Sequence, residues 1–583
     1  MFDRLKPLSP YLKRYWKSLA WGAIAVILYN SSKAMLPPVI GHAVDDMQHG
    51  VTSAVILHHA LRLLLVASIM AVFLYLSRQI IIGASREIEF DLRNDIFANL
   101  ERQQSSFFQT HRTGDIMART TNDLNAVRQL LGPAILYSAN TLFFTAAALP
   151  FMFRLSPRLT LFAFIPLPLA SIAVQGFGAR IHKRFERIQD MFSEISAKTQ
   201  ENFSGARLIR AFAQEEAEIS SFETANDEYI GRSLHLVRLM AMLWPTLELV
   251  LGISLVITLL VGGHEVISGH MTSGQFAEFM VYMVQLTWPM IAIGWVVNLF
   301  QRGTASVIRI DDLLKEKPTI EDVPALLAAN PVPITGSIEF RNLNFSYTPG
   351  VPVLEEINLT IPAGSSLAVV GPTGSGKSTL VNLIPRLYDA APGMVLIDGA
   401  PIQSQPLATL RRNIGFVPQE TFLFSDTIHH NIAFGRPDAT LQEIEDAAAT
   451  AYIRTEILEF PKGFETLVGE RGVTLSGGQK QRTSIARAVL RDPRILILDD
   501  ALASVDTHTE EQILSGLRRV MQGRTTILIS HRISTARNAD QIAVLVDGRI
   551  AELGTHDELL ASGGYYTRLY EKQQLEEELA VAN

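Results

Sequence analysis

A glycine-rich run in the second half of the chain has the spacing of a phosphate-binding loop. Residues 371–378, Gly-Pro-Thr-Gly-Ser-Gly-Lys-Ser, fit the pattern G-x-x-x-x-G-K-[ST], between an expected strand at 367–370 and an expected helix at 378–387. The glycines let backbone N–H groups close on phosphate oxygens at a helix N-terminus, Lys377 supplies positive charge, and the Ser378 hydroxyl can hold Mg²⁺. The run predicts nucleotide binding, although alone it leaves open an ordinary glycine turn.

A second run of residues ends in two carboxylates. Residues 495–498, Ile-Leu-Ile-Leu, are expected to form a buried strand that is followed by Asp499 and Asp500. Because a hard cation takes oxygen ligands, Asp499 suits Mg²⁺, directly or through water. The two runs together predict a site for a nucleotide and a magnesium ion.

Residues 475–479, Leu-Ser-Gly-Gly-Gln, narrow this prediction. With the phosphate loop, they make the segment from about 335 to 575 similar to the ATP-binding cassette (ABC) proteins, whose second phosphate-contacting motif is LSGGQ. The resemblance implies ATP and Mg²⁺ as cofactors. The cofactor-binding positions that it implies are Tyr347, which would stack on adenine, then Gly371, Pro372, Thr373, Gly374, Ser375, Gly376, Lys377, Ser378 and Thr379, and, in the second motif, Ser476, Gly477, Gly478 and Gln479.

The same resemblance implies metal-binding and catalytic positions. Gln419 matches the family's glutamine that reaches Mg²⁺ and the attacking water, so the implied metal set is Ser378, Gln419 and Asp499. Residues 504–506, Ser-Val-Asp, match the loop that crosses to the partner cassette. His531 matches the switch histidine near the γ-phosphate, and the implied catalytic set is Asp500, His531 and Gln419.

One position departs from the family pattern. The residue after Asp499 is normally Glu, the base that polarises the attacking water, whereas this chain has the shorter Asp500. A displacement of about 1 Å in a catalytic group can cost on the order of 10²-fold in rate. Residues 500–506 resemble the Mdl-like multidrug half-exporters, whose heterodimers pair one such chain with a Glu-bearing partner. Because His531 is retained, a homodimer stays open beside the favoured heterodimer.

The first 310 or so residues are expected to lie in a membrane. The whole chain of 583 residues is 48% hydrophobic and only 19% charged, which is unusual for a soluble protein of this length. Six stretches are long enough for a hydrocarbon core of roughly 30 Å, which needs about 20 apolar residues. They are 19–41, 63–85, 129–153, 159–179, 240–263 and 279–301. The first and second contain one basic residue each, Lys33 and Arg78.

Basic residues predict the orientation of these spans. Lys and Arg gather in the N-terminal tail and in the connections after the second and fourth spans, whereas residues 42–61 and 264–278 contain none. The basic residues therefore predict a multi-pass membrane protein with the N-terminus and the nucleotide-binding domain in the cytoplasm, and the resemblance to the Mdl-like half-exporters implies a bacterial inner membrane. The two basic connections are long, helical in pattern and interrupted near their far ends. In ABC exporters such breaks hold coupling helices that touch the cassettes, which places them here near 113–120 and 203–212.

The expected fold is multidomain. An all-α six-helix transmembrane domain with long cytoplasmic helical extensions (1–312) is followed by a linker (313–334) and an α/β P-loop nucleotide-binding domain (335–583). The resemblance implies an ATP-hydrolysing half-transporter that exports a hydrophobic or amphipathic small molecule, lipid or peptide across the lipid bilayer, or between its leaflets, as a dimer with a second half-transporter.

Other functions stay open or are disfavoured. A homodimeric lipid or drug flippase and an ATP-gated channel or regulator are alternatives, whereas the six spans disfavour a soluble ABC ATPase. The chain has no Cys, which excludes disulfides and thiolate metal sites, and its net charge of −7 gives no support to nucleic-acid binding.

Overall fold

The chain folds into two compact units. A computed structural model describes residues 2–48, 50–323, 326, 332–469, 472, 474–503 and 507–582. The helical unit comprises Met1–Glu101 and Arg112–Lys317, and the nucleotide unit comprises Arg102–His111 and Pro318–Asn583.

The helical unit is built from long helices joined by short turns. Its elements are η1 (Phe2–Leu8), α1 (Ser9–Arg14), α2 (Trp16–Ala34), α3 (Leu36–Gln48), α4 (Ser53–Arg102), α6 (Thr113–Ala118), η2 (Arg119–Asp123), α7 (Leu124–Gln129), η3 (Leu130–Ala134), α8 (Ile135–Leu155), α9 (Pro157–Phe164), α10 (Leu167–Ser204), α11 (Ala206–Ala211), α12 (Glu215–Ile267) and α13 (Ser273–Lys315). The turn η1 is a 3₁₀-helix, and η2 and η3 are π-helical turns within the third apolar helix.

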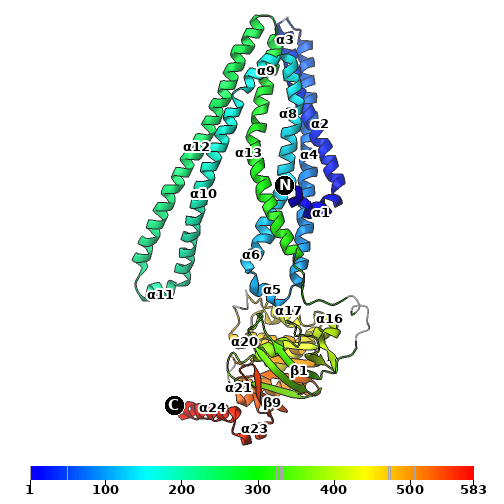
Figure 1. The fold of residues 1–583 in the computed structure, drawn as a ribbon, viewed down its shortest axis with the longest axis vertical. Coiled ribbons are helices and arrows are strands. Elements are labelled where there is room, and N and C mark those ends of the chain that lie inside the picture. Colours follow the sequence, from blue (N-terminus) through cyan, green and yellow to red (C-terminus); the bar gives the residue numbers. More distant parts are fainter. Residues whose placement is uncertain are drawn as a thin grey trace. The chain divides into compact units, whose positions relative to one another are not determined.

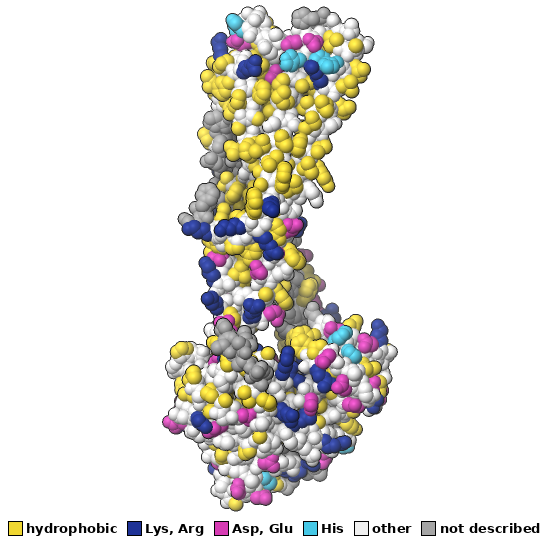
Figure 2. Space-filling model, turned by 90° about the vertical axis from the view of Figure 1, so that its right-hand side faces the viewer, with side chains coloured by type: hydrophobic (Ala, Val, Ile, Leu, Met, Phe, Trp, Pro, Cys, Tyr) yellow, Lys and Arg dark blue, Asp and Glu magenta, His cyan; other side chains and the backbone are white. Residues whose placement is uncertain are grey.

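Five helices of the described residues are long and apolar enough to cross a membrane. They are Trp16–Gln48, Ser53–Arg102, Thr113–Leu155, Glu215–Ile267 and Ser273–Lys315, and each contains one predicted span. The remaining predicted span, 159–179, is divided between α9 and α10, because the chain turns at Ile165 and Pro166. Proline lacks the N–H that a helix interior requires. Apolar side chains cover the face of this unit that Figure 2 shows, between charged groups toward either end.

Several helices are much longer than a membrane is thick. The helices α4 and α12 contain 50 and 53 residues. At 1.5 Å per residue such a helix runs for roughly 75 Å, against about 30 Å of hydrocarbon. The helices α10 and α12 lie side by side as a long hairpin closed by α11 (Figure 1). The long connections predicted to be helical are therefore continuations of the membrane helices.

The nucleotide unit is centred on two sheets. A four-stranded antiparallel sheet has the order β2-β1-β4-β5, and a six-stranded sheet has the order β10-β9-β3-β8-β7-β6. The strands are β1 (Ile338–Phe345), β2 (Leu354–Ile361), β3 (Ser366–Val370), β4 (Val395–Ile397), β5 (Ala400–Pro401), β6 (Ile414–Val417), β7 (Ile495–Asp499), β8 (Thr525–Ile529), β9 (Gln541–Val546) and β10 (Arg549–Gly554). In the larger sheet only β10 runs antiparallel to its neighbour.

Helices surround these sheets. They are α5 (Ser105–Thr110), α15 (Lys377–Asn382), α16 (Leu407–Arg412), α17 (Ile428–Ala433), α18 (Leu441–Thr450), α19 (Arg454–Glu459), α20 (Gly477–Leu490), α21 (Thr507–Met521), α22 (Ile533–Ala536), α23 (His556–Ser562) and α24 (Tyr565–Ala582). One apolar core lies between the sheets, and a second lies where β6 and β7 meet α17, α18 and α20. The helix α15 ends before the predicted limit of 387, since Pro385 interrupts the hydrogen-bond pattern.

A short segment from the first half of the chain belongs to the nucleotide unit. Within Arg102–His111, the Gln109 amide donates to the Tyr388 hydroxyl at 2.7 Å, and Gln104 Oε1 accepts from the backbone N of Thr319 at 3.1 Å. Phe107 of α5 is buried. This segment immediately precedes the first predicted coupling helix, 113–120.

Candidate nucleotide-binding and hydrolysis site

Four neighbouring parallel strands bring the predicted residues to one edge of the sheet. The strands β3, β8, β7 and β6 are adjacent in that order. Each strand is followed at its carboxyl end by predicted site residues. The phosphate loop follows β3, and His531 follows β8. Asp499 ends β7 and is followed by Asp500, and Gln419 lies after β6. Ligands of open α/β sheets bind outside the carboxyl ends of the strands. Residues that are far apart in sequence thus share one candidate site.

The phosphate loop has a backbone that only glycine accommodates. Gly371, Gly374 and Gly376 have φ values of 149°, 84° and 99°. A Cβ on Gly371 would lie 2.0 Å from the carbonyl oxygen of Leu545. The buried Ser375 hydroxyl has no hydrogen-bond partner among the described residues. This unsatisfied donor and the open turn fit a phosphate group.

Lys377 lies within this loop. Its Nζ donates to the carbonyl oxygens of Gly371 at 3.0 Å and Pro372 at 2.8 Å. Burial lowers the pKa of Lys377, whereas the charges of Asp500 and Asp499 act in the opposite direction. The ammonium is therefore held at the loop, where its positive charge is available to a phosphate group.

Asp499 and Ser378 provide oxygen ligands suited to a hard cation. Ser378 Oγ donates to Asp499 Oδ1 at 3.1 Å, and Asp499 is buried at the end of β7. Burial raises the pKa of Asp499 above its usual value, although the hydrogen bond from Ser378 acts in the opposite direction. Gln419 is exposed after β6. Hydroxyl, carboxylate and amide oxygens are the donor types that Mg²⁺ takes in nucleotide sites.

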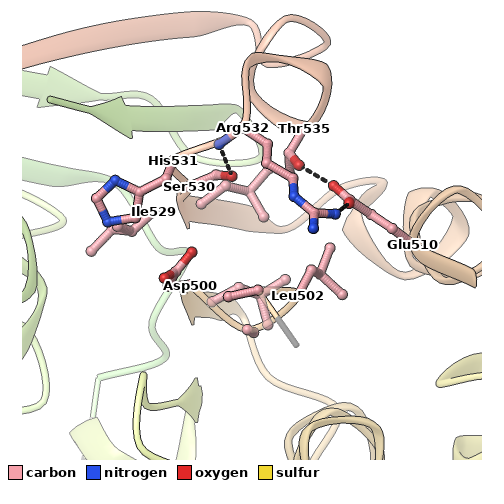
Figure 3. Close-up of a pocket in the computed structure, with 12 residues that line it drawn as sticks. Asp500, Leu502, Glu510, Ile529, Ser530, His531, Arg532 and Thr535 are labelled. Atoms are coloured by element: carbon pink, nitrogen blue, oxygen red, sulfur yellow. Dashed lines mark hydrogen bonds and ion pairs between the residues drawn. The ribbon is translucent and has the colours of Figure 1, made fainter. Parts of the chain in front are cut away.

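Asp500 lines a cavity of about 270 Å³ together with His531. Its backbone N donates to Ile529 O at 3.0 Å, and its φ of 48° places it in the left-handed region. Figure 3 shows the Asp500 carboxylate and the His531 ring on the same side of the cavity. On the other side Glu510 binds the Arg532 guanidinium and the Thr535 hydroxyl. The structure thus brings together the predicted base and the predicted switch histidine.

Tyr347 carries an aromatic ring beside the phosphate-loop helix. Its hydroxyl donates to Thr379 Oγ1 at 3.1 Å, and its ring meets those of Phe345 and Tyr388 edge-on at 5.1 and 5.0 Å. The residue remains 47% exposed. A ring held at its edges with exposed surface is suited to stacking on a flat base.

The LSGGQ run forms the N-terminus of a different element, the 14-residue helix α20. Ser476 Oγ accepts from the backbone N of Gln479 at 3.2 Å, and Gln479 Oε1 accepts from the backbone N of Ser476 at 2.9 Å. This capping box fixes the first turn, in which Gly477 and Gly478 lie. Free N–H groups and the helix dipole make such a terminus attractive to phosphate.

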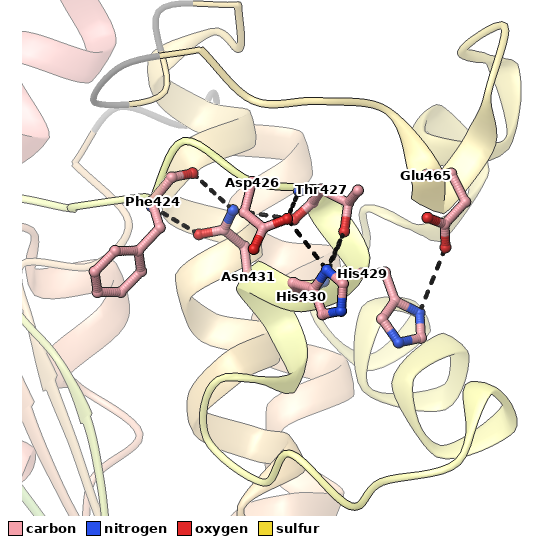
Figure 4. A network of polar contacts seen from close by, with 7 residues as sticks. All are labelled: Phe424, Asp426, Thr427, His429, His430, Asn431 and Glu465. Carbon is pink, nitrogen blue, oxygen red and sulfur yellow. Dashed lines mark hydrogen bonds and ion pairs between the residues drawn. The ribbon is translucent and has the colours of Figure 1, made fainter. Parts of the chain in front are cut away.

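Two residues that sequence reasoning missed connect α20 to the segment after Gln419. The Arg487 guanidinium donates to Asn431 O at 2.8 Å and to Phe422 O at 3.0 Å. Burial lowers the pKa of Arg487 to about 10. The Asn431 amide in turn binds the backbone N and O of Phe424, each at 2.9 Å, as Figure 4 shows. In the sequence, an arginine on an amphipathic helix is indistinguishable from a solvated one.

A third missed residue comes from the C-terminal helix. The Gln573 amide of α24 donates to the backbone O of His531 and accepts from the backbone N of Ile533 at 2.9 Å. Both bonds hold the turn that carries the switch histidine. Gln573 lies in a polar, Glu-rich run with no motif, so the sequence contains no signal for it.

Some predicted positions lie outside the described residues. They are Ser504, Val505 and Asp506 of the predicted crossing loop, and residues 324–325 and 327–331 of the predicted linker.

Comparison with known proteins assigns the family. Residues 19–290 match the family described as ABC transporter transmembrane region, and residues 354–503 match the family described as ABC transporter. The chain belongs to the ABC transporter family. It is 38% identical over 575 residues to the multidrug resistance-like ATP-binding protein MdlA of Escherichia coli (strain K12), covering 98% of this chain and 96% of that protein.

Two further relatives are informative. This ABC transporter is 36% identical over 580 residues to the ATP-dependent lipid A-core flippase of Syntrophus aciditrophicus (strain SB), covering 99% of this chain and 95% of that protein. A solved bacterial Atm1-family ABC exporter with ATP bound superimposes with a TM-score of 0.76 at 28% identity, over 96% of this chain and 98% of that one.

The fold and the relatives confirm the predicted class. The chain is an integral, multi-pass membrane protein that fuses a helical transmembrane domain to an α/β nucleotide-binding domain. It is an ATP-binding, ATP-hydrolysing transporter of the exporter type. With one membrane region and one nucleotide domain it is half of a transporter, and half-transporters function as dimers.

Proposed function

We propose that this ABC half-transporter exports a hydrophobic or amphipathic substrate as one subunit of a heterodimer, and that its own phosphate-loop edge forms the slower of the two ATP sites. The observation that carries this proposal is Asp500 at the position where the family has Glu. The carboxylate enters the same cavity as His531, so the site keeps its acid–base groups. The side chain is one methylene shorter than that of Glu.

The shorter reach affects hydrolysis more than binding. A general base contributes typically about 10²–10⁴-fold if it reaches the proton that it removes. Lys377, Ser378 and Asp499 have the contacts expected of a nucleotide site, and Asp500 is not among the groups that would hold phosphate. ATP should therefore bind at this edge and persist there.

The proposal includes a Mg²⁺ ion bound with ATP at this site. Ser378, Asp499 and Gln419 would hold the ion, which would supply positive charge to neutralise the phosphate oxygens. The hydrogen bond from Ser378 to Asp499 keeps both oxygens turned toward each other. Lys377 contributes the remaining positive charge from the loop itself.

The LSGGQ surface would serve the partner's site. Its capping box and N-terminal turn are complete, so the partner's ATP would meet an intact signature helix. Arg487 would hold that helix against the segment after Gln419 through Asn431. ATP binding would close the two nucleotide domains, and the coupling helices would turn the membrane cavity outward, as a shift between two states.

The membrane placement also remains a proposal. The basic residues of the N-terminal tail and of the two long connections favour a cytoplasmic N-terminus and nucleotide domain. The relatives named MdlA and lipid A-core flippase come from bacteria, which supports the inner membrane.

A homodimeric drug or lipid flippase is the second candidate. The retention of His531 and of a carboxylate at position 500 favours it, because together they leave a site with residual capacity to hydrolyse ATP.

Purification from the native membrane decides between the two. We expect a tagged copy of this chain to co-purify with a second, different half-transporter in equal amount, as judged by mass spectrometry of the intact complex. A complex made only of this chain would contradict the heterodimer and support the homodimer.

A further inference from the structure

The first apolar helix of the helical unit carries a cation on its packed face. Along α2 the buried positions recur every three or four residues, and they are Gly22, Ala25, Val26, Asn30 and Ala34. Such spacing marks a single stripe of a helix. Lys33 is half-buried and lies on this stripe, seven residues after Val26. Its side chain therefore joins the face that packs against other helices.

The neighbour of Lys33 is an aromatic ring of α8. Lys33 Nζ lies 4.1 Å from the centroid of the Phe144 ring, and Phe144 is buried. One turn earlier, the Asn30 amide donates to Asn140 Oδ1 of α8 at 2.8 Å and to Val26 O at 2.8 Å. Throughout the described part of the chain, no carboxylate or other hydrogen-bond acceptor contacts the Lys33 ammonium.

The depth of Lys33 makes this arrangement notable. In the predicted span 19–41 it lies three residues past the midpoint, or roughly 5 Å along the axis at 1.5 Å per residue. A charged group so deep in a membrane usually faces a bundle interior or cavity and pairs with an opposite charge or with backbone carbonyls. Aromatic contact attracts the cation but supplies no hydrogen-bond acceptor. Among the described residues, the Lys33 ammonium therefore has an aromatic neighbour but no negative partner.

Arg78 of α4 provides the contrast. It lies four residues past the midpoint of the predicted span 63–85, at a depth close to that of Lys33, but it is exposed, so its long side chain can extend along the outside of the helix toward the interface. Lys33 is held inward over Phe144 and does not have this option.

We propose that Lys33, with the Asn140 amide beside it, binds the acidic head group of the transported molecule, so that the substrates are anionic amphiphiles. A phosphate or carboxylate oxygen would accept from the ammonium, while an apolar tail would lie among the membrane helices. This inference rests on the proposed export function and names its substrate class.

The test uses the purified assembly, with its partner, in phosphatidylcholine nanodiscs. ATPase activity is titrated with dodecyl phosphate, dodecylphosphocholine and dodecyltrimethylammonium, which share one tail and differ in charge. We expect half-maximal change of ATPase at a concentration at least tenfold lower for dodecyl phosphate than for the cation. Lys33→Met should remove this preference, Lys33→Arg should keep most of it, and the matched control Arg78→Met should leave it intact.

A second arm distinguishes a bilayer lipid from a soluble amphiphile. With phosphatidylglycerol in the nanodisc, a raised half-maximal concentration for dodecyl phosphate would identify the anionic lipid as the occupant. An unchanged half-maximal concentration would identify the soluble amphiphile as the occupant. Either result supports an anion site at Lys33 if Lys33→Met abolishes the preference for dodecyl phosphate over the cation.

Three results would overturn the inference. They are no charge preference in the wild type, an unaltered preference in Lys33→Met, and loss of partner co-purification in Lys33→Met, which would place Lys33 in a subunit contact. If none of the amphiphiles alters ATPase activity, and if the assembly reconstituted in phosphatidylcholine vesicles transports none of them, the proposed export function fails as well. Transport with no charge preference contradicts only the role of Lys33.

Discussion

The two surfaces of the nucleotide unit that resemble ATP-contacting surfaces differ in how much of the family chemistry they keep. The phosphate-loop edge has the constrained glycines, Lys377 and the Ser378–Asp499 pair, but a shortened carboxylate at Asp500. The signature surface at α20 is complete, with Ser476 and Gln479 capping the helix reciprocally.

This difference indicates that the departure from the family pattern, Asp in place of Glu at position 500, is confined to the phosphate-loop edge. If, as proposed, the two surfaces of one chain serve different ATP molecules, a weak base at one edge does not weaken the other surface. The geometry of Asp500 supports the same conclusion, because its backbone bond to Ile529 and its cavity with His531 show a formed site rather than a collapsed one. The slow site and the complete surface should therefore respond separately to mutation.

The largest effect is expected at the phosphate-loop edge. Lys377→Ala removes the positive charge that faces Asp499 and Asp500, and should lower ATP binding or turnover at this chain's site by about 10²-fold or more. Labelling with a photoreactive ATP analogue, followed by digestion to locate the labelled peptide, measures this. Lys462→Ala, which removes the same charge from an exposed position, is the control. Equal labelling in Lys377→Ala and wild type would exclude Lys377 from phosphate binding.

The signature surface should affect the opposite site. Ser476→Arg places a bulky cation at the first turn of α20, and should reduce hydrolysis at the partner's site by about 10-fold or more while labelling at this chain's Tyr347 persists. Thr440→Arg is the matched control, because Thr440 with Glu443 forms the same capping box on α18. Loss of labelling at this chain's own site in Ser476→Arg would show that both surfaces serve one ATP.

The C-terminal helix should have a smaller effect. Gln573→Leu removes two hydrogen bonds to the turn that carries His531, each worth about 1 kcal/mol, and should lower kcat several-fold with little change in KM for ATP. Gln574→Leu is the matched control, since the contact of the Gln574 side chain among the described residues is its donation to the Tyr570 hydroxyl at 2.7 Å, away from His531. Equal kcat values for the two variants would remove Gln573 from a positioning role.

The smallest effect on activity is expected at Arg487, where the change should appear in stability. Arg487→Met leaves the carbonyls of Phe422 and Asn431 without a donor, and should lower the free energy of unfolding by about 1–3 kcal/mol. Thermal unfolding of the purified assembly measures this, with the exposed Arg518→Met as control. Identical melting curves for the two variants would show that the Arg487 contacts contribute nothing.

The sequence predicted the fold class and the residues at the sheet edge, because their spacing follows from how phosphate loops and parallel strands are built. Gly371 and Asp499 could be recognised in this way. Gln573 and Arg487 could not, since their partners are backbone carbonyls that only the folded chain brings near. The membrane helices were found from hydropathy, but the division of span 159–179 at Pro166 depends on the turn between α9 and α10. The aromatic neighbour of Lys33 is likewise a product of packing.

The central claim concerns Asp500, and ATPase activity of the chain purified alone tests it most directly. The measurement compares the wild type with Asp500→Asn and Asp500→Glu in proteoliposomes. We expect slow hydrolysis by the wild type, little further loss in Asp500→Asn, and faster turnover in Asp500→Glu, which restores the missing methylene. Vigorous hydrolysis and transport by the wild-type chain alone, abolished in Asp500→Asn, would show that Asp500 is a competent base and that the protein works as a homodimer.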